Sequence, residues 1–90
     1  MREKYHNKLK QFFRKKLLLT RDALNLTQEQ MSEKLSMSVR SYSDLEGGKS
    51  TCGVLTLVLF LIYFCPDAKQ FLNELKSAYE SDDDFSEIKN

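Results

Sequence analysis

Apolar residues recur every three or four positions through most of this chain, the spacing that places side chains on one face of an α-helix. The longest such stretch, residues 3–24, predicts an amphipathic first helix. Its apolar positions are Tyr5, Leu9, Phe12, Phe13, Leu17 and Leu24. Asn25 follows and suits a left-handed helix stop. Basic side chains fall largely on the other faces of this helix.

Two shorter helices are predicted over residues 27–46. Thr27 and Gln30 have the spacing of a capping box, which marks a helix start. Residues 36–38 resemble a short turn, because serines compete with the helical backbone and prefer caps. Ser38 can cap a third helix over 39–46, which Gly47 and Gly48 end. The inward apolar positions of the two helices are Met31, Leu35, Tyr42 and Leu45.

Residues 54–65 are almost wholly apolar and admit three interpretations. As a helix the run is roughly 18 Å long, too short for a hydrocarbon core of about 30 Å, so a membrane span is disfavoured. Val, Ile, Phe and Tyr favour β-strands, but every other segment is predicted helical and offers no strand partner. The pattern therefore predicts a buried helix, with Leu57, Phe60, Leu61 and Phe64 facing the core.

Pro66 ends that helix and suits the first turn of the next one. The last stripe consists of Ala68, Phe71, Leu72, Leu75, Ala78 and Tyr79. From Ser81 the chain becomes acidic, which predicts a frayed, flexible tail. The sequence thus predicts an all-α, five-helix domain over residues 1–80 and a flexible tail over 81–90.

The composition argues against several classes of function. The chain has 90 residues, with one His, two Cys and one Pro. His6 and the two thiols are too few for a zinc site or a catalytic triad, so we expect no enzyme, metal or cofactor. Cys52 and Cys65 are interpreted as free thiols of a cytoplasmic protein. No apolar signal region opens the chain, so we expect no secretion.

Charge is divided unevenly between the two halves. Residues 1–49 carry 11 Lys and Arg against 6 Asp and Glu, while residues 50–90 carry 3 against 7. The first half is therefore +5 and the second −4. This asymmetry indicates an anionic partner at the N-terminal half, although a solvated helix face would give the same pattern.

Residues 24–35 and 38–49 carry a resemblance to a known family. The Thr27–Gln28 opening, the apolar spacing and the ending Leu45, Glu46, Gly48, Lys49 are similar to those of the Cro/repressor-type helix-turn-helix family, also called the xenobiotic-response-element family. In this motif the second helix enters the major groove of DNA. The resemblance implies a helix-turn-helix at about 27–46, a sequence-specific transcriptional regulator and double-stranded DNA as partner.

The resemblance also implies DNA-binding residues. Gln28 would contact phosphate at the start of the scaffold helix, although an exposed Gln without a role is the alternative. Arg40 would read guanine or hold a phosphate. Lys49 would lie near the sugar-phosphate backbone. The other expected contacts are Ser38, Val39, Ser41, Ser43 and Asp44.

Two of these positions depart from a usual DNA reader. Val39 lies where the family often has a polar base contact, and it could pack on a thymine methyl group. Asp44 could accept from cytosine N4, pair with Arg40 one turn earlier, or repel DNA. A structural pair is implied as well: Glu46 would meet Arg21 and fix the recognition helix against the first helix.

Residues 54–65 hold more apolar side chains than one core face needs. Those left over are Leu55, Val58, Leu59, Ile62 and Tyr63. A two-fold homodimer would cover them and would place two recognition helices about 34 Å apart. The alternative is a different protein bound to the same helices, as in an antitoxin or antirepressor. We expect a dimeric repressor, with this interaction module as the second hypothesis.

Overall fold

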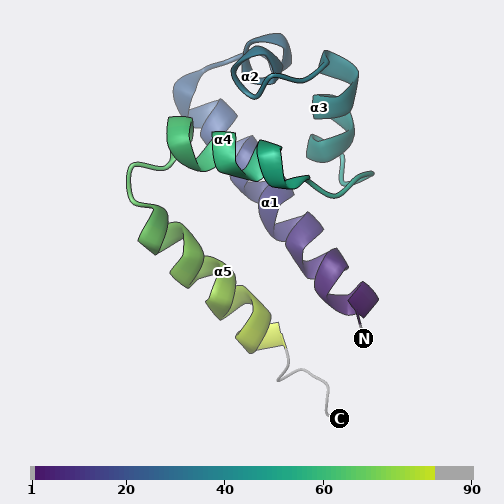
Figure 1. Cartoon of the computed structure of the whole chain (residues 1–90), viewed down its shortest axis with the longest axis vertical. Helices are drawn as coiled ribbons and strands as arrows, with labels where there is room; N and C mark the ends of the chain where they lie inside the picture. Colours follow the sequence, from purple (N-terminus) through teal and green to yellow (C-terminus); the bar gives the residue numbers. More distant parts are fainter. Residues whose placement is uncertain (1, 83–90) are drawn as a thin grey trace.

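The structure is a computed structural model that describes the backbone of residues 2–82 and the side chains of residues 2–80. This part of the chain contains five α-helices and no strand. They are α1 (Arg2–Leu24), α2 (Gln28–Lys34), α3 (Val39–Glu46), α4 (Val54–Phe64) and α5 (Ala68–Asp82) (Figure 1). The predicted all-α, five-helix architecture is confirmed. The predicted tail begins inside α5, and its residues 83–90 lie outside the described residues.

Local capping signals define α2 and α3. The Thr27 side chain accepts from the Gln30 N–H at 3.1 Å, and the Gln30 side chain accepts from the Thr27 N–H at 2.8 Å. Ser38 caps α3 by accepting from the Ser41 N–H at 3.1 Å. Asn25 and Ser36 have positive φ angles of 56° and 55° and turn the chain after α1 and α2. The predicted capping box, serine cap and left-handed stop are therefore confirmed.

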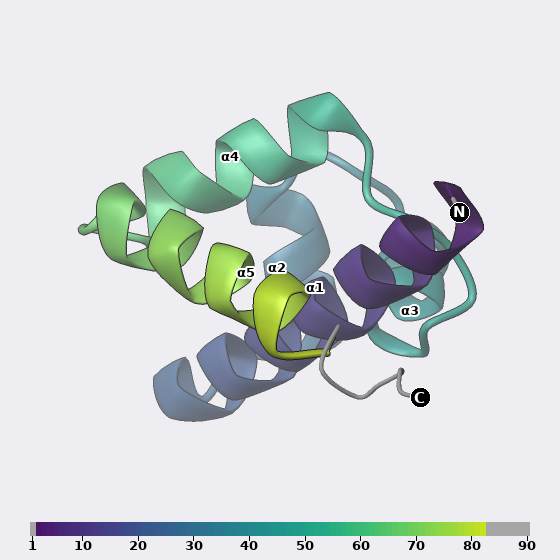
Figure 2. The same cartoon turned by 90° about the horizontal axis from the view of Figure 1, so that it is seen from below.

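The N-terminal half of α1 runs antiparallel to α5 (Figures 1 and 2). The Tyr5 and Tyr79 rings stack with centroids 5.4 Å apart, and Phe12 meets Phe71 edge to face at the same separation. One turn further along, Lys16 forms an ion pair with Glu74. These contacts hold the last helix against the first and leave the far side of α1 for α3.

The core draws at least one side chain from each helix. Its fully enclosed members are Phe13, Leu17, Met31, Leu35, Tyr42, Leu45, Phe60 and Phe71. Phe60 of α4 meets Phe13 of α1 edge to face with centroids 5.1 Å apart. The inward positions predicted for α2 and α3 are all buried, as expected from their spacing.

The structure corrects several packing predictions. The apolar run at 54–65 is a helix but not a buried one: within α4 only Phe60 is buried, while Leu57, Leu61 and Phe64 are half-buried against the core. A chain this small cannot surround one apolar helix with the other four. Leu24 and Leu72, predicted to face inward, are 53% and 52% exposed.

The start of α5 also differs from the prediction, because Pro66 lies before the helix and not in its first turn. The helix begins at Ala68, and Asp67 caps it by accepting from the Gln70 N–H at 3.1 Å. A carboxylate at this point satisfies a backbone donor that the helix itself leaves unpaired.

Candidate nucleic-acid interface

The outer face of α3 is a row of exposed side chains. Val39, Arg40, Ser41 and Ser43 are exposed there, whereas Tyr42, Leu45 and Glu46 on the other face are buried. Within the described part of the chain, Arg40 takes part in no hydrogen bond or ion pair. The start of α3 therefore presents a guanidinium and several hydroxyl groups to a ligand, on a helix whose inner face is fixed.

The pairing of Arg40 with Asp44, one of the three alternatives for Asp44, is absent among the residues that the structure describes. Asp44 is half-buried, and its backbone carbonyl accepts from the N–H of Lys49 at 2.8 Å and of Ser50 at 3.3 Å. These bonds fold the loop after α3 back onto the helix. Lys49 is exposed in that loop.

Four side chains from three segments meet at Glu46, and we call them the Glu46 cluster: Arg21, Gln28, Tyr42 and Glu46. Arg21 donates to both carboxylate oxygens, from Nε at 2.6 Å and from Nη2 at 3.1 Å. Its Nη1 donates to the Leu26 carbonyl at 3.1 Å. The structure thus brings Arg21 and Glu46 together as a bidentate pair, the geometry in which such pairs are strongest.

Tyr42 and Gln28 complete the cluster. The Tyr42 hydroxyl donates to Oε2 of Glu46 at 2.5 Å, and the Gln28 side-chain amide donates to Oε1 at 2.9 Å. Neither contact with Glu46 was expected from the sequence. The spacing of Tyr42 and Glu46, one helical turn apart on α3, was the available signal. The contact with Gln28 crosses from α2 to α3 and left no such signal.

Glu46 is ionised over the physiological range. Its burial acts to raise the pKa of the carboxyl group, but hydrogen bonds from Arg21, Tyr42 and Gln28 outweigh burial and lower the pKa. Burial, reinforced by the bond to Glu46, raises the pKa of Tyr42, so this hydroxyl keeps its proton and stays a donor. The cluster therefore joins α1, α2 and α3 through one buried carboxylate, each of whose two oxygens accepts two hydrogen bonds.

The orientation of the Gln28 amide follows from this charge. An ionised carboxylate only accepts hydrogen bonds, so Gln28 must turn its NH₂ group, and not its carbonyl, toward Glu46. One N–H is then used by Glu46 and a second remains. Gln28 is half-buried rather than freely exposed, so the interpretation as an exposed residue without a role is wrong.

A model of the helix-turn-helix family matches residues 17–63, just over half of the chain, from the second half of α1 through nearly all of α4. The chain belongs to the Cro/C1-type helix-turn-helix family. Members of this family are DNA-binding transcription regulators and, in general, not enzymes. Comparisons with curated proteins and with solved structures found no match.

This helix-turn-helix protein also exposes an apolar surface on α4. Leu55, Val58, Ile62 and Tyr63, all predicted to lie outside the core, are 65%, 43%, 67% and 61% exposed. Val54, which sequence analysis did not assign, is 80% exposed and extends this surface. Leu59 was expected here too, but it is half-buried and packs against the core. We call Val54, Leu55, Val58, Ile62 and Tyr63 the α4 face.

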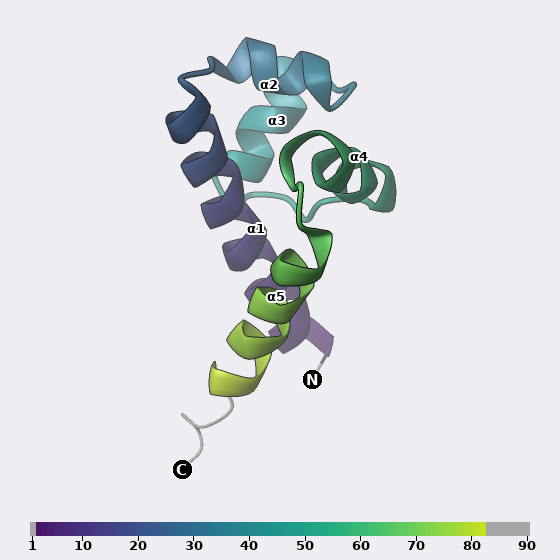
Figure 3. The ribbon, with the colours of Figure 1, turned by 90° about the vertical axis from the view of Figure 1, so that its left-hand side faces the viewer.

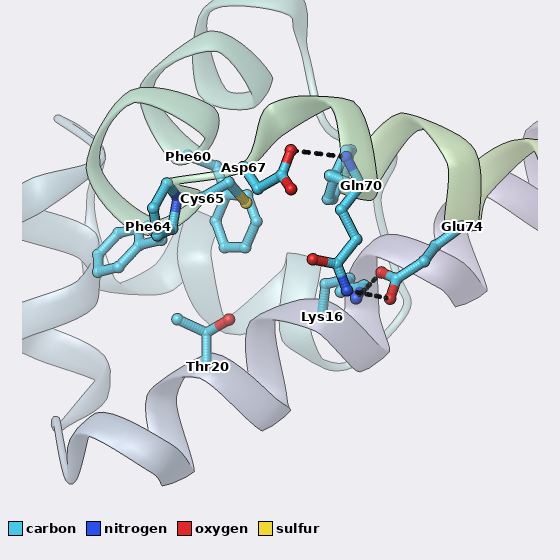
Figure 4. A pocket seen from close by; sticks show the side chains of 10 residues that line it. Lys16, Thr20, Phe60, Phe64, Cys65, Asp67, Gln70 and Glu74 are labelled. Atoms are coloured by element: carbon cyan, nitrogen blue, oxygen red, sulfur yellow. Dashed lines mark hydrogen bonds and ion pairs between the residues drawn. The ribbon is translucent and has the colours of Figure 1, made fainter.

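A cleft of about 230 Å³ lies between α1, α4 and α5 (Figure 4). Phe60, Phe64 and Cys65 border it from one side, and the Lys16–Glu74 ion pair from the other. Cys52 and Cys65 are both free thiols, as predicted, and burial raises the pKa of each. Within residues 2–80, no group of His, Cys, Asp and Glu could hold a metal ion. None of the described helices is long and apolar enough to cross a membrane.

Proposed function

We propose that this helix-turn-helix protein is a sequence-specific transcriptional repressor, which acts in the cytoplasm by occupying an operator as a homodimer. The observation that carries the proposal is the division of α3 into two faces. Its inner face is fixed by the Glu46 cluster, and its outer face leaves Arg40 exposed and without an intramolecular partner among the described residues. A recognition helix needs both features, because base edges are read only by side chains held in register.

The proposed contacts follow from the chemistry of each group. The planar fork of Arg40 matches O6 and N7 of guanine, and Val39, 41% exposed, can pack on a thymine methyl group. Asp44 is half-buried, so only its exposed part can accept a hydrogen bond from cytosine N4. Ser41 and Ser43 can donate to bases or phosphates. Ser38 is partly engaged, because it caps α3 and donates to the Ser41 hydroxyl at 3.0 Å.

Gln28 and Lys49 are proposed as phosphate contacts. Gln28 lies at the start of α2 and keeps one side-chain N–H that Glu46 does not use. Lys49 is exposed in the loop after α3, and its side chain has no partner within the described chain. Contacts of this kind set the register of the protein on the duplex and carry no sequence information themselves.

Dimerisation through the α4 face is the second part of the proposal. Figures 2 and 3 show α4 at one side of the molecule, with no described helix beyond its outer face. A contiguous apolar surface of this kind favours association. A two-fold pairing would bury the same face on both copies and give two recognition helices for successive major grooves.

Selection of bound fragments from random duplex DNA tests the DNA-binding proposal. The full chain should enrich a short sequence motif. A mobility shift with that motif should persist in the presence of excess random competitor DNA. A two-fold repeated motif with half-sites about one helical turn apart would support the dimer. Binding of all sequences with equal affinity would refute sequence-specific regulation.

The α4 face favours a second candidate, a protein-interaction module that binds a different protein there. In that case the same face would remain exposed in a monomer of the purified chain, and DNA binding would be weak or absent. Light scattering on the purified chain separates the two candidate functions. A stable homodimer would contradict the protein-interaction module, because the α4 face would then be covered by a second copy of the chain.

A further inference from the structure

Arg14 packs against the loop that follows α3. It precedes Arg21 by about two helical turns, so both side chains project from the same face of α1. Arg21 reaches Glu46 at the end of α3, and Arg14 reaches Gly48 just beyond it. A methyl group at Gly48 would lie 3.2 Å from Cδ and 3.6 Å from Nε of Arg14. The absence of a side chain at Gly48 therefore lets the stem of Arg14 lie against the loop backbone.

The two arginines differ in what satisfies their charge. Arg21 is paired with Glu46, whereas Arg14 makes no hydrogen bond or ion pair within the described part of the chain. Arg14 is nonetheless half-buried. A partly desolvated guanidinium has five donors to satisfy, and an anion from outside the chain is the natural acceptor.

A second cation lies next to this position. Lys49 directly follows Gly48 and is exposed, and its side chain also has no partner among residues 2–80. Arg14 and Lys49 therefore flank Gly48 from α1 and from the loop. Both lie at the C-terminal end of α3, away from the Ser38 end whose side chains are proposed to read bases.

We propose that Arg14 binds a phosphate of the DNA backbone, next to the phosphate that Lys49 contacts, and so anchors α1 to the duplex. The inference rests on the proposed DNA-binding function and adds a contact from a helix outside the helix-turn-helix. A phosphate fits better than a base because Arg14 lies on α1, outside the α3 helix whose exposed residues are proposed to read bases. The planar guanidinium can donate two parallel hydrogen bonds to phosphate oxygens.

The salt dependence of DNA binding tests this contact. Each neutralised phosphate of duplex DNA contributes about 0.9 to the slope of log K against log salt concentration. In the full chain, Arg14→Ala should reduce the slope by about 0.9 per bound protomer and weaken selected and random duplexes by the same factor. Arg14→Lys should restore most of the slope, because it keeps the charge.

Lys15→Ala is the matched control, since Lys15 is the next residue, is exposed, and makes no hydrogen bond or ion pair within the described chain. It lies about 100° further around α1 and should leave the slope unchanged. Arg14→Gln removes the charge but keeps a polar side chain, so it should reproduce the slope loss even if Arg14→Ala perturbs folding.

Three results would count against the inference. A wild-type slope in both Arg14→Ala and Arg14→Gln, with operator binding retained, would overturn the Arg14 contact alone. An equal slope loss in Lys15→Ala would show a diffuse electrostatic effect and would overturn it too. Failure of the wild-type chain to bind any duplex would overturn the DNA-binding function itself.

Discussion

Replacing Arg21 by Ala should destabilise this protein strongly, because it removes the bidentate cationic partner of a buried carboxylate. The Glu46 side chain is only 6% exposed, whereas that of Arg21 is 28% exposed. Removing one partner of a buried pair costs about 3–5 kcal/mol. Tyr42 and Gln28 would still donate to the stranded carboxylate, and water reaches the Arg21 side, so we expect about 2–4 kcal/mol. A loss of about 3 kcal/mol lowers the melting temperature of a domain of this size by roughly 12–24 °C.

The pH dependence of this loss identifies the carboxylate as its origin. In the wild type the pKa of Glu46 lies below its ordinary value of 4.5, so its contribution to stability is present above that value. It is lost as the pH falls through the lowered pKa of the folded state. In Arg21→Ala, burial would still act to raise the pKa of Glu46, and only the hydrogen bonds from Tyr42 and Gln28 would act to lower it. The destabilisation caused by Arg21→Ala should therefore be largest near pH 7 and shrink below about pH 4.5.

Urea unfolding followed by circular dichroism, between pH 3 and pH 7, measures this effect. Glu74→Gln is the control, because Glu74 is paired with Lys16 on the surface and its side chain is 41% exposed. Its hydrogen bond from Lys16 lowers the pKa of Glu74, yet solvent screens the pair and little stability should be lost. Two results would contradict an origin in the pairing of Arg21 with Glu46: additive losses in Arg21→Ala, Glu46→Ala and their double variant, or a pH-independent loss in Arg21→Ala.

Three further predictions test the remaining interactions. Tyr42→Phe removes a donor to a charged group and should cost about 1.5–3 kcal/mol in the same urea assay; a loss below about 0.5 kcal/mol would contradict the bond to Glu46. Ile62→Asp should convert the proposed dimer into a helical monomer by light scattering at tens of micromolar, whereas Leu72→Asp, an exposed leucine on α5, should leave the dimer intact. Arg40→Ala should cost about 1–3 kcal/mol at the selected operator and relax its specificity, while Gln28→Ala should weaken all duplexes evenly; an equal loss on specific and random DNA in Arg40→Ala would show that Arg40 does not read a base.

Local signals made the helix boundaries predictable. The capping box at Thr27, the cap at Ser38 and the stop at Asn25 each depend on residues within four positions of one another. Such short-range hydrogen bonds form wherever these residues occur together, so the sequence alone was sufficient. The periodic positions in α2 and α3 gave the inner faces of both helices for the same reason.

Burial of α4 was not predictable, because it depends on how much surface the other helices can cover. An almost wholly apolar helix has no pattern that marks its inner side, so Leu59 was assigned to the outside although it packs on the core. Leu24 and Leu72 show the opposite error: Leu24 continues its stripe to the last residue of α1, and Leu72 is exposed although its neighbour Phe71 is buried. Helical spacing fixes which residues share a face, not how far a neighbour extends.

Caps, periodicity and motif spacing are local properties, so the all-α fold, the helix-turn-helix and the exposed residues of its second helix could be predicted from the sequence alone. The pairing of Arg21 with Glu46 was expected from the family resemblance. The contacts of other polar side chains became known only from the tertiary packing: Gln28 is turned toward Glu46, and Arg14 lies against Gly48 without an acid within the described chain. These outcomes depend on which side chains from distant segments meet, and that follows from the packing of α1, α2 and α3 around one buried carboxylate.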